Sequence, residues 1–242
     1  MTTAPADWRD RVIAVVGCGG LGVPAAWTLA LAGARQLRLI DDDVVELSNL
    51  HRQVRYREAD VGAPKAACLA AALQRRFSGL QVDVRRARLT AASAPALLAD
   101  AAAVFEGSDD AVCKFEVNDR VVAAWAGGPG PRVGVIAAAV ARRGQWMVLT
   151  PAGACYRCLF EAPPPPESLA TCETAGVLGP VVGHVGAAAA RALVAELMGR
   201  PDPARSALVR WEAGAYRRTE VRPASDCGCG VARPTFGLRR PD

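Results

Sequence analysis

The segment Gly-Cys-Gly-Gly-Leu-Gly at residues 17–22 has the glycine spacing of a phosphate-binding loop. It lies between a β-branched run at 12–16 and an alanine-rich segment, which is the strand–turn–helix context that gives this spacing meaning. The first glycine permits a tight turn, the second lets the backbone approach a phosphate, and the third lets helix and strand pack closely. Asp41 follows the next apolar run, where a carboxylate can accept ribose hydroxyls. The sequence therefore predicts a nucleotide site, with a glycine turn that binds no ligand as the alternative.

Two cations, Arg52 and Lys65, follow at positions where a turn and a helix start would direct them toward the phosphates. A dinucleotide's phosphates are already served by the helix N-terminus, whereas a triphosphate carries further negative charge that Arg and Lys can balance. These residues favour ATP. An NAD(P)-dependent oxidoreductase on the same fold is the main rival hypothesis.

The cysteines suggest a metal site. Cys155-x-x-Cys158 has the spacing of half a zinc site, and Cys227-Gly-Cys229 could complete four thiolate ligands. No secretory signal is visible at the N-terminus, so a cytoplasmic location is expected, and there thiols stay reduced. Structural Zn²⁺ is therefore predicted, the alternative being a lost site with idle thiols. Cys18, Cys68 and Cys113 are expected to be small fillers.

Strands that alternate with helices must position these residues. The fold class predicted is α/β: a Rossmann-like, mostly parallel sheet with helices on both faces, extended by a C-terminal antiparallel hairpin and a zinc knuckle. The expected strands cover residues 12–16, 37–40, 81–84, 102–105, 132–137 and 145–149, with a hairpin over 208–211 and 216–221. The expected helices reach to about residue 32 and cover 63–77, 115–125 and 176–198. Residues 1–150 would form the ATP-binding region, and 151–242 a crossover loop, long helix, hairpin and cysteine-ligated part of the same compact domain.

Composition excludes several classes of protein. With 242 residues, of which 51% are hydrophobic, the chain can bury a sizeable core and is not disordered. Its net charge is +5, but basic residues occur at most in pairs, so no nucleic-acid partner is expected. The most apolar long stretch, 177–198, contains His184, Arg191 and Glu196. A bilayer would penalise these charges, so a buried helix is expected and no membrane partner.

Several motifs together carry a family resemblance. They are Gly-x-Gly-Gly-Leu-Gly at 17–22, Asp-x-Asp-x-Val-Glu-Leu-Ser-Asn-Leu-x-Arg-Gln at 41–53 and Val-Gly-x-Pro-Lys at 61–65, with further matches at 107–110, 118–119, 155–160 and 171–180. In these motifs the chain resembles the ThiF/MoeB/HesA family of ubiquitin-activating-enzyme-like adenylyltransferases, over about residues 11–230.

The resemblance implies ATP-dependent adenylation of the C-terminal Gly-Gly carboxylate of a small ubiquitin-like sulfur-carrier protein. It places Mg²⁺ on Asp109, and Arg52, Lys65 and Asp109 in the catalytic step. The residues implied at the nucleotide are Gly17, Gly19, Gly20, Gly22, Asp41, Asp43, Asn49, Arg52, Gln53, Lys65 and Asp109. Three simpler roles stay open: Asn49 as a turn cap, Lys65 as a solvated first-turn residue and Asp109 as the cap of the following helix. Gln53 is expected in a structural role.

The resemblance further implies that Cys172 is a thiol able to attack or carry the acyl group, the alternative being a small loop residue. A separate sulfur donor (a rhodanese or a cysteine desulfurase) and a homodimer are expected. The chain departs from the family at Lys114, where arginine is usual, and at Glu106, where aspartate is common. It also begins only about ten residues before its first strand, so a family helix carrying an arginine is expected to be missing. A non-catalytic scaffold that binds a ubiquitin-like partner, or only a nucleotide, is the third hypothesis.

Overall fold

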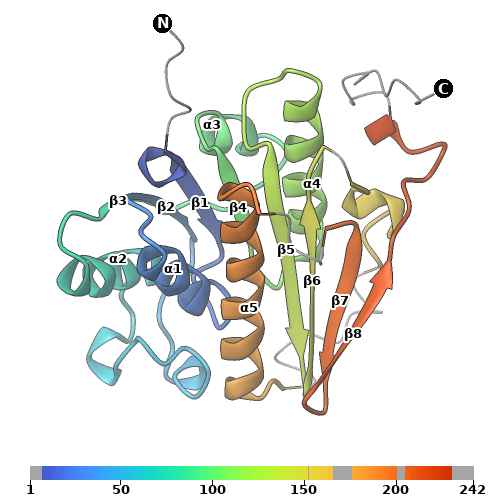
Figure 1. Cartoon of the computed structure of the whole chain (residues 1–242). Helices are drawn as coiled ribbons and strands as arrows, with labels where there is room; N and C mark the ends of the chain where they lie inside the picture. The colour runs from blue at the N-terminus through green and yellow to red at the C-terminus, as the bar shows by residue number, and fades with distance from the viewer. Residues whose placement is uncertain (1–6, 152, 166–175, 201–204, 231–242) are drawn as a thin grey trace, which may run out of the picture.

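The computed structural model describes residues 7–151, 153–165, 176–200 and 205–230, and one eight-stranded sheet runs through them (Figure 1). Across the sheet the strands are ordered β3-β2-β1-β4-β5-β6-β7-β8. In chain order the strands are β1 (Val12–Val16), β2 (Gln36–Ile40), β3 (Gln81–Arg85), β4 (Ala103–Glu106), β5 (Val133–Val140), β6 (Arg143–Leu149), β7 (Ala207–Glu212) and β8 (Ala215–Glu220).

The sheet changes character at β5. All pairings from β3 to β5 are parallel, whereas β5, β6, β7 and β8 pair antiparallel. The chain order reverses beside β1, since β2 lies on one side of it and β4 on the other. At such a reversal the connection after β1 and the connection after β4 lead to opposite sides of the sheet, and a crevice opens between them at the carboxyl ends of the strands.

Helices cover both faces of the parallel part (Figure 1). Their bounds are α1 (Gly22–Leu31), α2 (Lys65–Arg76), α3 (Ala94–Leu98), α4 (Ala111–Trp125) and α5 (Gly179–Leu197). Side chains alternate along β1: Ile13 and Val15 join an apolar cluster with α1, α2 and α5, while Ala14 and Val16 join a second cluster with α3 and α4. The sheet is thus buried on both sides here, which explains its uninterrupted β-branched strand.

The long apolar helix α5 lies inside the fold. By length and composition alone it could cross a membrane, yet Val185, Ala189 and Leu193 are fully buried. Val185 packs on β6 so closely that a Cβ at Gly144 would collide with it. The apolar face of α5 therefore packs against the sheet and α1. This is the buried helix that its charged residues predicted in place of a membrane span.

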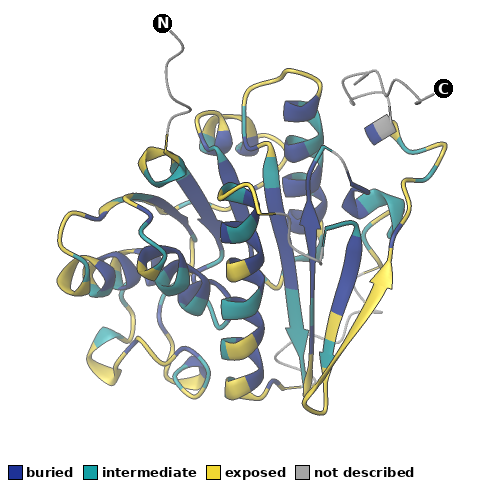
Figure 2. Ribbon diagram, viewed as in Figure 1, coloured by how far each residue is buried: buried dark blue, intermediate teal, exposed yellow. Residues whose placement is uncertain are grey.

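Exposure rises toward the last strand. Every residue of β8 is exposed, as Figure 2 shows, while β1 and β4 are almost entirely buried. The predicted fold class is confirmed. The sequence missed α3, began α4 four residues late at 115 and began α5 early at 176. Short 3-10 turns complete the described elements: η1 (Trp8–Asp10), η2 (Leu47–Asn49), η3 (Glu58–Asp60), η4 (Tyr156–Cys158) and η6 (Gly228–Gly230).

Candidate functional site

A cavity of about 1300 Å³ opens at the carboxyl ends of β1 and β4. Its walls include the glycine loop, the acidic turn after β2 and the turn after β4. From there it extends along β5 and β6 to the end of β7. This cavity thus coincides with the reversal of strand order, the usual ligand site of open α/β sheets.

Two glycines of the loop, Gly17 and Gly22, have the backbone roles expected of them. Gly17 adopts a φ of 83°, which a residue with a side chain rarely takes, and its amide donates to Ile40 O at 2.9 Å. A Cβ at Gly22 would collide with Gly17 O, so only glycine lets α1 start this close to β1. Gly17, Gly19 and Gly20 line the cavity, whereas Gly22 shapes the loop from behind.

Asp41 is fixed by two backbone amides. Its Oδ2 accepts from Cys18 N at 2.6 Å and its Oδ1 from Asp43 N at 2.8 Å. Burial raises the pKa of Asp41, and these two hydrogen bonds act in the opposite direction. The carboxylate is thereby held at the cavity wall, where its remaining lone pairs can accept further hydrogen bonds.

The two predicted cations, Arg52 and Lys65, both line the cavity. Lys65 is 7% exposed and its Nζ lies 2.8 Å from Asp43 Oδ2, so the alternative of a solvated first-turn residue is wrong. The stem of Arg52 lies against the loop, since a Cβ at Gly20 would be 3.7 Å from its Cγ. Among the described residues Arg52 makes no ion pair, and its one hydrogen bond, to Ser48 O, is long at 3.4 Å. Arg52 is therefore available to an anion.

Gln53 and Asn49 are buried near Arg52 in the sequence and contact each other. Gln53 is 3% exposed, its Nε2 donates to Asn49 Oδ1 at 3.5 Å, and its Oε1 has no hydrogen-bond partner among the described residues. Gln53 lines the cavity, but Asn49 does not: it is buried in η2, where its amide donates to Ser48 Oγ at 3.1 Å. Its contacts within this turn fit the alternative role of a turn cap.

Lys114 and Glu106 form a buried pair on the other side of β1. Lys114 Nζ donates to Glu106 Oε2 at 2.6 Å, to Ser108 O at 2.7 Å and to Ala137 O at 2.9 Å. Glu106 also accepts from Ser108 N at 2.8 Å and is fully buried; burial raises its pKa, and Lys114 opposes this. All three ammonium protons are used, so Lys114 joins the turn after β4 to β5.

The two aspartates of that turn have different roles. Asp110 caps α4, because its Oδ1 accepts from the amides of Val112 and Cys113. Asp109 is exposed and lines the cavity. Asp110 and not Asp109 is therefore the cap, so the alternative that Asp109 caps this helix is wrong.

Tyr56 holds part of the cavity wall in place, and the sequence did not reveal it. Its buried hydroxyl lies 2.6 Å from Cys18 O and 3.2 Å from Lys65 O, so it connects the glycine loop to the start of α2. Burial is the main cause that raises its pKa, which keeps it a neutral donor. It stands in a polar, irregular stretch with no spacing signal, so only the tertiary contacts identify it.

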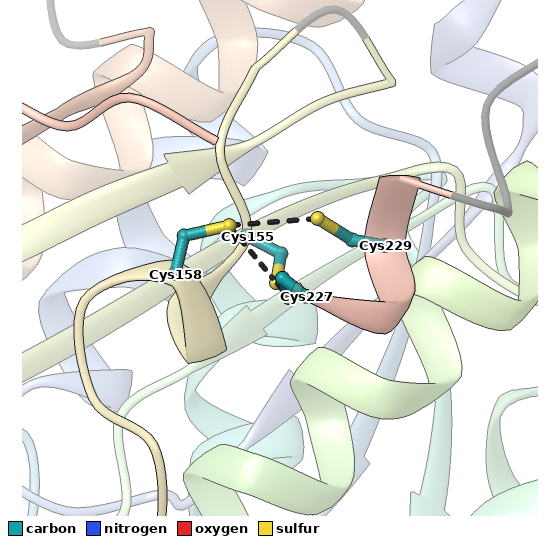
Figure 3. A group of neighbouring side chains, drawn as sticks. All are labelled: Cys155, Cys158, Cys227 and Cys229. Atoms are coloured by element: carbon teal, nitrogen blue, oxygen red, sulfur yellow. Dashed lines mark hydrogen bonds between the residues drawn. The ribbon is translucent and has the colours of Figure 1, made fainter. Parts of the chain in front are cut away.

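The four cysteines converge from two distant segments, η4 and η6 (Figure 3). Cys155 Sγ lies 3.5 Å from Cys227 Sγ and 3.8 Å from Cys158 Sγ, and Cys158 Sγ lies 3.5 Å from Cys229 Sγ. A tetrahedron with Zn–S bonds of ~2.3 Å has S···S edges of ~3.8 Å. None of these four cysteines forms a disulfide, their sulfur positions fit such an ion, and the single glycine between Cys227 and Cys229 does not prevent convergence.

The cysteine cluster is tied to the cavity wall through α4. Tyr156 N donates to the buried Asn118 Oδ1 at 2.7 Å, and Arg157 forms a bidentate pair with Asp119 at 2.7 and 2.8 Å. Tyr156 packs edge-on against Phe115. Phe115 and Tyr156 also line the cavity, so residues next to the cluster form part of this wall. Cys172 lies outside the described residues.

The ThiF family model matches residues 4–231. The chain belongs to the ThiF family. It is 35% identical over 232 residues to the adenylyltransferase and sulfurtransferase MOCS3 of Anopheles gambiae, covering 94% of this chain and 51% of that protein. It is 39% identical over 187 residues to the adenylyltransferase and sulfurtransferase uba4 of Aspergillus terreus, covering 74% and 37%. This member thus spans about half the length, or less, of these curated relatives.

Solved structures agree on the fold of this ThiF family member. Escherichia coli MccB, in a structure with ATP, superposes with a TM-score of 0.79 at 19% identity, covering 93% of this chain and 68% of that one. A second MccB structure, with AMPCPP and the peptide MccA, gives the same TM-score over 92% and 67%. The mixed sheet with its parallel core is thus shared with these proteins.

Proposed function

We propose that this protein binds ATP and adenylates the C-terminal Gly-Gly carboxylate of a small ubiquitin-like sulfur-carrier protein. The observation that carries the proposal is the joint placement of the glycine loop, Lys65 and Arg52, which forms no ion pair with a described residue, in one cavity that continues along β5 and β6. The sulfur-transfer relatives and the ATP-bound MccB structure support it.

In the proposed reaction a carrier carboxylate oxygen attacks the α-phosphorus of ATP. The bond between that phosphorus and the bridging oxygen to the β-phosphorus breaks, and pyrophosphate leaves with the electron pair. The amides of Gly19 and Gly20 at the start of α1 bind phosphate oxygens, Arg52 and Lys65 balance the developing charge, and Asp41 accepts the ribose hydroxyls. No protein nucleophile is needed, because orientation and charge neutralisation suffice for this step.

Two metals belong to the proposal. Asp109 would hold Mg²⁺, which supplies charge neutralisation at the pyrophosphate leaving group. Cys155, Cys158, Cys227 and Cys229 would hold a structural Zn²⁺, closed to substrate by its four protein ligands. Elemental analysis of the purified protein is expected to give one zinc per chain. A purified protein that contains no zinc and still unfolds in one cooperative thermal transition would contradict the structural Zn²⁺ site.

The remaining parts of the proposal concern assembly. Both halves of the chain, 1–150 and 151–242, contribute strands to one sheet, which supports a single domain. A homodimer, a cytoplasmic location and a separate sulfur donor stay predictions. Cys172 would act after adenylation, so Cys172→Ala is expected to retain pyrophosphate exchange and to change sulfur transfer only.

Radiolabelled pyrophosphate exchange into ATP tests the activity. Exchange should require Mg²⁺ and a Gly-Gly carrier, and should vanish with a carrier that lacks its last glycine. Asp109→Asn should reduce exchange and raise the Mg²⁺ concentration needed, while Asp42→Asn, also at the cavity wall, serves as the matched control. A titration with NADH covers the rival hypothesis: tight NADH binding without exchange would overturn the proposal.

A further inference from the structure

A row of polar side chains crosses the last three strands on one face of the sheet. Gln145 of β6 is paired with Arg210 of β7, which is paired with Arg217 of β8. Both arginines are exposed, and Arg210 also lines the far end of the cavity. A positive row thus begins where the cavity ends and continues outward over the edge of the sheet.

The charge of this row is not neutralised within the described part of the chain. In the adjacent row Arg143 Nε lies 2.6 Å from Glu212 Oε1, whereas neither Arg210 nor Arg217 forms an ion pair with a described residue. Like charges directly opposite on neighbouring strands are destabilising. The fold therefore retains an unfavourable pair that a negatively charged partner would relieve.

The cavity restricts what that partner is. It connects the glycine loop with Arg210, so a polypeptide whose C-terminus reaches the loop leaves the cavity past the arginine row. Its residues upstream of the tail would then lie on Arg210 and Arg217. A nucleic acid could use the same charges but has no carboxyl terminus for the cavity, so the geometry favours a protein.

We propose that Arg210 and Arg217 form a docking row for carboxylate side chains of the carrier, just upstream of its C-terminal tail. This inference rests on the proposed function and deepens it, since it states the charge of the partner that the site selects. Arg210 guides the tail at the cavity mouth, and Arg217 extends the contact along β8. Electrostatic pairing of this kind gives specificity and speeds association, and it weakens with salt.

Fluorescein-labelled peptides of equal length that end in Gly-Gly test the row. They carry three glutamates, three glutamines or three lysines upstream of the tail, and binding is followed by anisotropy at low salt. The glutamate peptide is expected to bind about ten-fold more tightly than the lysine peptide, with the difference shrinking at high salt. The double variant Arg210→Glu/Arg217→Glu should invert this order.

Arg218→Glu is the matched control, because Arg218 lies on the same exposed strand but is paired with Val209, on the opposite face. It should keep the preference for glutamate. Equal binding of all three peptides, or an equal effect of both variants, would overturn the docking row. A single-stranded oligonucleotide that displaces the glutamate peptide and binds more tightly than it would also overturn the docking row.

Pyrophosphate exchange separates the two proposals. If exchange occurs with a carrier but the peptide order is absent, the docking row is wrong and the activity stands. If the peptide order holds but no Gly-Gly carrier supports exchange, the adenylation proposal is wrong.

Discussion

Two lysine–carboxylate pairs stand on either side of β1 and differ in one respect. In the pair Lys65–Asp43 the lysine side chain is 9% exposed and the aspartate 66%; in the pair Lys114–Glu106 the values are 9% and 0%. The solvated Asp43 can exchange its contact with Lys65 for water at little cost, which releases the ammonium to a phosphate. Glu106 is fully buried, so it cannot exchange its contact with Lys114 for water. The burial of the acid therefore separates a lysine that can serve a ligand from one that holds the fold together.

The largest expected effect comes from breaking the buried pair. Lys114→Met leaves Glu106 buried without its cation and should lower the free energy of unfolding by ~3–5 kcal/mol. At 2–4 °C per kcal/mol this lowers Tm by roughly 10 °C in a thermal melt. The double variant Lys114→Met/Glu106→Gln, which removes both charges, should recover part of the loss. A single variant that melts like the original would contradict the structural role.

Removing Lys65, whose partner Asp43 is exposed, should affect activity instead. Lys65→Met is expected to reduce pyrophosphate exchange by ~10²–10³-fold, the usual loss when one stabilising contact to a developing charge is removed. Because Asp43 stays hydrated, Tm should change by no more than about 2 °C. Asp43→Asn is the comparison: it removes the pair but keeps the cation, so exchange should fall much less than in Lys65→Met. If Lys65→Met instead lowers Tm as much as Lys114→Met does, the contrast between the pairs is wrong.

Asp110 lies between these extremes, with a side chain 27% exposed. Asp110→Ala removes the cap of α4 and should lower the free energy of unfolding by ~1 kcal/mol. Asp109→Ala, one residue earlier and exposed, should leave Tm unchanged, which makes the two variants a matched pair in one melting experiment.

The pH dependence of Asp110 has a definite sign. Burial raises its pKa, but hydrogen bonds from Arg88 and from the amides of Cys113 and Val112 outweigh burial, and the pKa is lowered below the ordinary 3.8. A lowered pKa means that the stabilisation is present above the unfolded value and is lost as pH falls through the folded one. The Tm difference between the protein and Asp110→Ala should therefore shrink below about pH 4. A difference that grows on acidification would contradict it.

The smallest effect is expected at Arg210 and Arg217, which form no ion pair with a described residue. Arg217→Gln removes the like-charge contact with Arg210 and should raise the free energy of unfolding by ~0.2–1 kcal/mol. The gain in Tm should be greatest at low salt and disappear at high salt. Arg143→Gln is the control, since it breaks an existing pair with Glu212 and should give no gain.

The sequence was most informative where local geometry and chemistry coincide. The glycine loop is readable because Gly17 needs a positive φ and Gly22 needs the missing Cβ, both local demands. Its charge and its place at an expected helix start singled out Lys65, the family resemblance added Asp109, and both line the cavity. The same pattern placed Asn49 at the nucleotide, although its amide is directed into η2. Tyr56 escaped notice because its partners, Cys18 O and Lys65 O, are backbone groups that carry no sequence signal.

By itself the sequence determined the α/β order of elements, the phosphate loop, and the family, since periodicity and short motifs depend on neighbours along the chain. The tertiary structure alone decided which of two similar lysines is fixed, whether Cys227 and Cys229 meet Cys155 and Cys158, and that Arg210 and Arg217 stand opposite each other on neighbouring strands. These properties depend on burial and on contacts between residues far apart in the chain. Burial sets the strength of a charge pair, and strand register sets which charges meet.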